Sequence, residues 1–184
     1  SSIRARTASC CSISATAGTR HRMRAALTES QVIAALRRAN AVAQAALQAG
    51  RHPFGALLLA ADGATVLLEQ GNVDTVRHAE SELARAAVQR FDAATLWDCT
   101  LVTTVEPCAM CAGTQYWAHI GRLVYGLAEQ RLLALTGSHA ENPTLDLPCR
   151  EVFARGQKAI EVIGPVAAEE DEIAALQRGF WSTR

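Results

Sequence analysis

Residues 78–111 decide the fold of this chain: they begin with HAE (78–80) and end with PCAMC (107–111). His78, Cys108 and Cys111 supply an imidazole and two thiols, which are the donors that zinc most often takes from proteins. Two thiols three positions apart at the start of a helix lie on one face and can reach one ion. The pattern therefore predicts one zinc ion held by three side chains.

Glu80 follows His78 by two positions, which is too close for comfortable ligation of the same ion. Three protein ligands leave the fourth position of a tetrahedral zinc site open to water, and zinc lowers the pKa of that water to ~7. Glu80 is well placed to accept the water proton and pass it on. A structural or redox CxxC motif is the alternative, but neither explains the HxE element that precedes it.

The run TTVEPCAMCAG (103–113) carries a resemblance to a known family. Together with HAE it resembles the zinc-dependent cytidine deaminase superfamily, whose signature is HxE followed by PCxxC. Within that superfamily it is similar to the branch of tRNA adenosine deaminases and bacterial guanine deaminases, over residues 28–181. The resemblance implies that His78, Cys108 and Cys111 bind Zn2+ and that Glu80 is the catalytic proton shuttle.

The hydrophobic pattern predicts a three-layer α/β/α sandwich around a five-stranded mixed sheet, which is the cytidine-deaminase-like fold. The motif TESQ (28–31) has the form of a capping box and opens the first helix, which Gly50 ends. We expect strands at 54–60, 65–69, 100–105, 122–126 and 159–163, and a last helix at 167–180. Helical sequence between the fourth and fifth strands favours a parallel pair, because a parallel neighbour needs a long crossover.

The charge distribution separates an N-terminal segment from the rest of the chain. Residues 1–27 carry five Arg and no acid, so residues 28–184 carry 13 basic and 18 acidic side chains, a net charge of 13 − 18 = −5. An acidic domain disfavours nucleic acid, whose affinity for proteins comes largely from Lys and Arg. No apolar run reaches the ~18 residues of a membrane span. The six Cys are not spaced like a disulfide framework, which favours a reducing, cytoplasmic compartment.

We expect two parts, a disordered segment over residues 1–22 and a zinc-dependent deaminase domain over residues 23–184. The segment is rich in Ser, Thr, Ala and Arg without periodicity. It resembles an organelle transit peptide, or else an added leader or over-extended reading frame ahead of a start at Met23. The family resemblance further implies a homodimer.

Three hypotheses for the function follow. The first is hydrolysis of a small amino-substituted nucleobase or nucleoside, with guanine favoured because PFGA (53–56) resembles the guanine branch; free cytosine is a further candidate. The second is a tRNA adenosine-to-inosine deaminase, and the third is a non-catalytic zinc scaffold, which intact Glu80 disfavours. The predicted substrate contacts are Asn72 by resemblance, Phe54, and Trp181, which could stack on a base or pack in the core.

Overall fold

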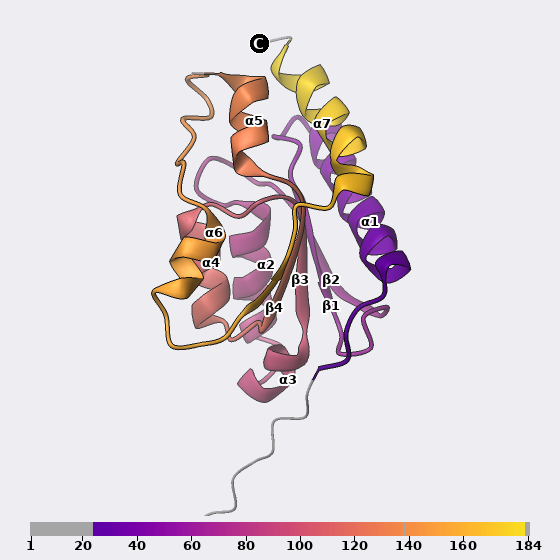
Figure 1. Ribbon diagram of the computed structural model, residues 1–184. Helices are drawn as coiled ribbons and strands as arrows, with labels where there is room; N and C mark the ends of the chain where they lie inside the picture. Colours follow the sequence, from indigo (N-terminus) through magenta and orange to yellow (C-terminus); the bar gives the residue numbers. More distant parts are fainter. Residues whose placement is uncertain (1–23, 138, 183–184) are drawn as a thin grey trace, which may run out of the picture.

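The computed structural model of the chain describes residues 24–137 and 139–182 (Figure 1). The expectations for residues 1–22 lie outside this range. No helix within the described residues is both long and apolar enough to cross a membrane.

A five-stranded mixed sheet in the order β2-β1-β3-β4-β5 forms the centre of the molecule. β1 pairs antiparallel with both β2 and β3, whereas β3–β4 and β4–β5 are parallel. The parallel fifth strand expected from the sequence is confirmed. The strands are β1 (Gly55–Leu59), β2 (Val66–Gly71), β3 (Thr100–Val105), β4 (Arg122–Leu127) and β5 (Glu161–Ile163).

Helices cover both faces of the sheet, as the three-layer prediction requires. α1 (Glu29–Gln48) and α7 (Ala167–Trp181) lie on one face, and α2 (Ala79–Val88), α4 (Ala109–Trp117) and α6 (Cys149–Ala154) lie on the other (Figure 1). Successive side chains of a strand point to opposite faces. Leu58 accordingly joins the core under α2 and α4, whereas Leu57 and Leu59 join the core under α1.

The first helix begins at the predicted capping box. The hydroxyl of Thr28 accepts a hydrogen bond from the Gln31 amide at 3.2 Å, and the Gln31 side chain accepts one from the Thr28 amide at 2.9 Å. Gly50, with φ of 76°, follows the helix in the left-handed conformation that glycine adopts without steric cost.

Two short helices were not expected from the sequence, and β5 is shorter than expected. α3 (Ala93–Asp98) and α6 span six residues each, which is too short for a hydrophobic period to stand out. The Asp92 side chain caps α3 by accepting a 2.7 Å hydrogen bond from the Thr95 amide. β5 begins at Glu161 rather than at residue 159.

The topology brings the residues of both sequence motifs to one end of the sheet, where the strands begin or finish. α2 and α4 both begin at the edge where β3 and β4 end, and β1 starts at this edge because it is antiparallel to β3. Ligand sites of open α/β sheets commonly lie outside the carboxyl ends of the strands. α5 (Glu129–Thr136) follows β4 and lies at the same end of the molecule (Figure 1).

Candidate active site

The two sequence motifs occupy the N-termini of two neighbouring helices. His78 is the N-cap of α2, and Glu80 lies in its first turn. Cys108 is the N-cap of α4, and Cys111 lies three residues later in the first turn. Pro107 immediately precedes this N-cap, outside the helix.

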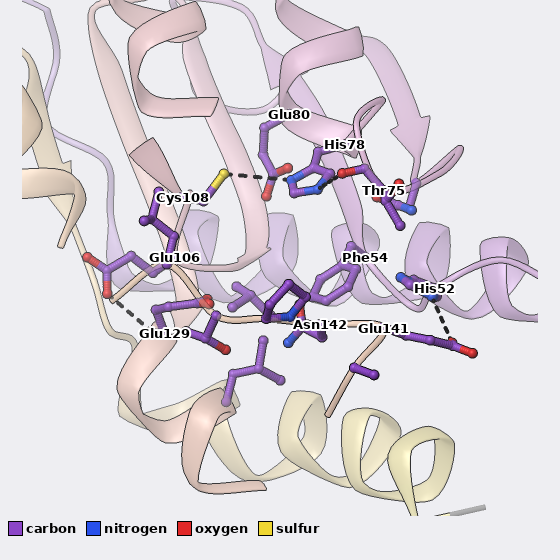
Figure 2. Close-up of a pocket in the computed structure, with 17 residues that line it drawn as sticks. His52, Phe54, Thr75, His78, Glu80, Glu106, Cys108, Glu129, Glu141 and Asn142 are labelled. Carbon is purple, nitrogen blue, oxygen red and sulfur yellow. Dashed lines mark hydrogen bonds and ion pairs between the residues drawn. The ribbon is translucent and has the colours of Figure 1, made fainter. Parts of the chain in front are cut away.

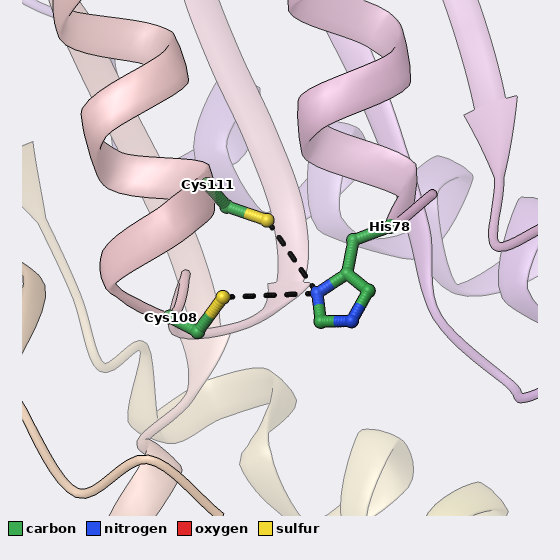
Figure 3. A group of neighbouring side chains, drawn as sticks. All are labelled: His78, Cys108 and Cys111. Carbon is green, nitrogen blue, oxygen red and sulfur yellow. Dashed lines mark hydrogen bonds between the residues drawn. The ribbon is translucent and has the colours of Figure 1, made fainter. Parts of the chain in front are cut away.

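His78, Cys108 and Cys111 converge on one point (Figure 3). The Nδ1 atom of His78 lies 3.5 Å from Sγ of Cys111 and 3.7 Å from Sγ of Cys108, and all three ligand atoms lie within 4.8 Å of one another. Tetrahedral zinc with bonds of ~2.3 Å to sulfur and ~2.0 Å to nitrogen would place a nitrogen and a sulfur ligand about 3.5 Å apart. The donor set and the two nitrogen–sulfur distances therefore fit zinc.

A neighbouring carbonyl orients the imidazole. The Nε2 atom of His78 lies 3.1 Å from the carbonyl oxygen of Thr75, which can only accept a hydrogen bond. A proton on Nε2 leaves the lone pair of Nδ1 directed at the two sulfurs. Such a contact is typical of metal-bound histidines, whose second nitrogen donates to a carbonyl or carboxylate.

The three candidate ligands differ in the direction in which their pKa values are shifted. The hydrogen bond with Cys108 raises the pKa of His78 to about 9, and a hydrogen bond from Cys111 lowers the pKa of Cys108 to about 4. The pKa of Cys111 is raised, first by its hydrogen bond to Cys108 and then by burial. Zinc must displace the remaining protons, so its affinity for this site rises with pH.

Glu80 is buried beside the ligands, with 5% of its surface exposed. Its Oε1 accepts a 2.7 Å hydrogen bond from the Thr103 hydroxyl, and its Oε2 lies 3.6 Å from Sγ of Cys111. Burial raises the pKa of Glu80 above the usual range of a carboxylic acid. A carboxyl group whose pKa is closer to neutrality is better suited to accept and return a proton.

A cavity of about 330 Å³ opens in front of these residues (Figure 2). Its walls come from the strand ends and helix starts on one side and from α5 and the following connection on the other. The described residues that line it are His52, Phe54, Asn72, Thr75, His78, Glu80, Val105, Glu106, Cys108, Glu129, Leu132, Ala140, Glu141, Asn142, Pro143, Thr144 and Leu145.

Two of the three predicted substrate contacts line this cavity. Asn72 is 2% exposed; its amide nitrogen donates to the Asp74 carbonyl at 3.1 Å, and its backbone N–H donates to the Phe54 carbonyl at 2.9 Å. Trp181 is not among the described residues that line the cavity. It is buried in α7, and its ring packs 5.2 Å from that of His52, which does line it. Direct contact between Trp181 and a base stays a prediction.

The opposite wall was not anticipated from the sequence. It includes Glu129 at the start of α5, and Glu141 and Asn142 from the connection that follows. Burial, and next the charge of Cys108, raises the pKa of Glu129 to about 7. The Nε2 atom of His52 lies 3.5 Å from Oε2 of Glu141. Nothing local in the sequence of residues 129–145 marks them as part of a cavity wall, because they reach the site only through the path of the chain after β4.

Comparison with known proteins agrees with this site. Residues 29–127, more than half of the chain, match the family model for the cytidine and deoxycytidylate deaminase zinc-binding region. A probable cytosine deaminase of Schizosaccharomyces pombe is 36% identical over 154 residues, which cover 81% of this chain and 91% of that protein. The guanine deaminase of Bacillus subtilis is 42% identical over 77 residues, 40% of this chain and 49% of that protein.

A solved structure shares the fold. The guanine deaminase from Nitrosomonas europaea superposes with a TM-score of 0.63 at 20% identity, covering 88% of this chain and 90% of that chain. The helix-borne His78, Cys108 and Cys111, with Glu80 beside them, stand within the matched region. The chain therefore belongs to the cytidine and deoxycytidylate deaminase family of zinc-dependent hydrolases.

Proposed function

We propose that this enzyme hydrolytically deaminates a free amino-substituted nucleobase, with guanine the first candidate. The charge of the cavity wall carries the proposal. The described lining contains four glutamates, Glu80, Glu106, Glu129 and Glu141, and neither lysine nor arginine. A phosphate group would find neither a lysine nor an arginine in this described lining, and proteins bind phosphates mainly through such cationic side chains.

The size of the cavity supports a small substrate as well. About 330 Å³ lies near the lower end of the ~300–1,000 Å³ that small-molecule pockets span. The Phe54 ring offers an apolar face to an aromatic base, while the Asn72 amide offers a donor and an acceptor. These groups suit a neutral heterocycle with polar edges.

Glu80 would perform the proton transfers of the reaction. Zinc, when held by His78, Cys108 and Cys111, supplies a hydroxide nucleophile near neutral pH by lowering the pKa of water. Glu80 accepts the first proton of this water and delivers it to a ring nitrogen, and it then transfers the second proton, from the hydroxyl added to the ring carbon, to the departing amine. The C–N bond breaks, a C=O bond remains, and ammonia leaves, so one water is consumed per base. The hydrogen bond from Thr103 keeps Glu80 in place during both transfers.

Guanine is placed first because PFGA (53–56) resembles the guanine branch and the Bacillus subtilis guanine deaminase is a relative. Cytosine is the second candidate, since the Schizosaccharomyces pombe relative covers most of both chains. A tRNA adenosine substrate is disfavoured by the acidic wall. A homodimer stays a prediction.

Ammonia release over a substrate panel tests the proposal. The panel contains guanine, cytosine, adenine, guanosine and an RNA stem-loop with adenosine at the wobble position. We expect turnover of a free base, guanine most efficiently, and no inosine in the stem-loop. Glu80→Gln is the control, and it should keep zinc but lose ~10²–10⁴-fold in rate. Inosine formation without turnover of any free base would refute the proposal.

A further inference from the structure

Glu106 joins three parts of the active site that are far apart in the sequence. It stands between the end of β3 and the zinc ligand Cys108, and is 8% exposed. Its backbone N–H donates to the Leu127 carbonyl at 2.8 Å, which continues the pairing of β3 with β4. The backbone of Glu106 is therefore fixed by the sheet, and its side chain extends towards the cavity wall.

Both carboxylate oxygens of Glu106 accept hydrogen bonds from helix N-termini. Oε2 accepts from the Glu129 amide at 3.3 Å, and Oε1 accepts from the Cys149 amide at 3.0 Å (the first of these contacts is drawn in Figure 2). Glu129 is the first residue of α5, and Cys149 is the first residue of α6. The first amides of a helix have no partner within the helix, and an anion is stabilised beside them.

Neither helix can supply this cap from its own sequence. The N-cap residues are Ala128 for α5 and Pro148 for α6, and neither makes a side-chain capping bond. Glu106 therefore replaces two local caps at once. Glu106, two residues before Cys108, thus caps the first turns of both α5 and α6.

Described residues on either side of position 138, in the segment between these anchors, form one wall of the cavity. Eight of the lining residues lie between positions 129 and 149, namely Glu129, Leu132, Ala140, Glu141, Asn142, Pro143, Thr144 and Leu145. The opposite wall carries His78 and Glu80. The two walls must keep a fixed separation for a base to sit against the metal, because small displacements of a substrate can cost large factors in rate.

We propose that Glu106 is a positioning residue for the substrate: its carboxylate holds both ends of the 129–149 wall segment against the turn that carries Cys108. The inference rests on the proposed function, because it requires the wall segment to contact the bound base. Glu106 does not act as a proton shuttle here, since both its oxygens are engaged by backbone amides. Its effect on the reaction passes through Glu129 and the wall segment.

Glu106→Gln tests the proposal with little change in shape. The amide nitrogen of Gln cannot accept a hydrogen bond, so one of the two bonds from the Glu129 and Cys149 amides is lost. In its place, the side-chain N–H group of Gln faces a backbone N–H group. Hydrogen bonds to charged groups contribute ~1.5–3 kcal/mol, which corresponds to about tenfold or more. We expect KM for the base that the wild type turns over to rise about tenfold or more, kcat to change less than about threefold, and zinc to stay at one per chain.

Hydrogen exchange gives a readout that does not depend on turnover. Backbone amides of residues 129–149 should exchange about tenfold faster in Glu106→Gln than in the wild type. Gln115→Met is the matched control, since it removes two 3.2 Å bonds from a buried side chain to the Ile120 and Arg122 carbonyls, away from the cavity. It should lower Tm without changing KM or exchange in the wall segment.

The outcomes separate the role of Glu106 from the identity of the substrate. If no base is turned over by the wild type, faster exchange confined to residues 129–149 still supports the positioning role. Unchanged KM and exchange, or loss of zinc, would overturn it. If Glu106→Gln does not fold, Glu106→Asp is tested in the same way, because a side chain shorter by one methylene cannot reach both amides. Failure of both variants to fold, with Gln115→Met folded, would also contradict the proposal.

Discussion

The hydroxyl of Thr103, on the central strand β3, donates a 2.7 Å hydrogen bond to Oε1 of Glu80, on the first turn of α2. This bond ties the carboxyl of the proposed proton shuttle to a strand whose residues are all buried. It leaves Oε2 on the side of the zinc ligands, 3.6 Å from Sγ of Cys111. The orientation of the proposed proton shuttle thus depends on a residue outside the HxE motif.

Thr103→Val should lower kcat by about tenfold while zinc content stays unchanged. Valine keeps the branched shape and removes the hydroxyl, which leaves a buried carboxyl oxygen without its donor at a cost of ~1–3 kcal/mol. Steady-state kinetics and elemental analysis measure the two quantities. Thr104→Val is the control, because the Thr104 hydroxyl accepts only a long 3.4 Å bond from the Gly55 amide. Equal effects of the two variants would contradict the assigned role of Thr103.

Cys108→Ser should abolish stoichiometric zinc binding. Serine lacks the thiolate that zinc prefers, and the remaining His78 and Cys111 make only two ligands. Elemental analysis should give one zinc per wild-type chain and far less in the variant. Cys99→Ser replaces a buried thiol outside the ligand cluster and should keep the metal. A Cys108→Ser protein that retains zinc would show that the ligand set is wrong.

Glu129→Gln should raise Tm relative to the wild type above pH 7 and leave it nearly unchanged near pH 4.5. Burial raises the pKa of Glu129 from 4.5 to about 7, so the folded state binds this proton more tightly than the unfolded state does. The stability of the wild type therefore falls as pH rises from about 4.5 to about 7. A difference of ~2–5 °C at pH 8 is expected for a domain of this size.

Differential scanning calorimetry across pH 4.5–8 measures this effect. Glu172→Gln removes an exposed carboxylate on α7 and serves as the control for the loss of a carboxylate as such. A Glu129→Gln difference that does not vary with pH would exclude the raised pKa.

Deleting residues 1–22 should leave Tm and activity unchanged, whereas deleting residues 1–26 should lower Tm by several degrees. The Arg24 side chain donates to the Trp97 carbonyl at 2.6 Å and lies 4.9 Å above the Trp97 ring. The buried Arg122 donates to the Ala25 carbonyl at 2.9 Å. Thermal unfolding of both truncated proteins provides the measurement. Equal Tm values would show that these contacts do not stabilise the domain, and a loss of stability in the shorter deletion would place residues 1–22 within it.

Elements with a strong local signal could be predicted from the sequence. The capping box at Thr28, the strand at 100–105 and the parallel fifth strand are all confirmed. The six-residue helices α3 and α6 were missed, because a helix of this length shows no hydrophobic period.

By itself, the sequence determined the metal site: the ligands lie within a few residues of two helix starts, where spacing along the chain fixes their relative positions. The tertiary structure decided what faces the metal. Thr103 reaches Glu80 only through the packing of α2 on β3, and Glu106 reaches Cys149, 43 residues away, only because β4 and α5 return the chain to the same edge of the sheet. Contacts of this kind depend on how strands and helices pack, and no local pattern encodes them.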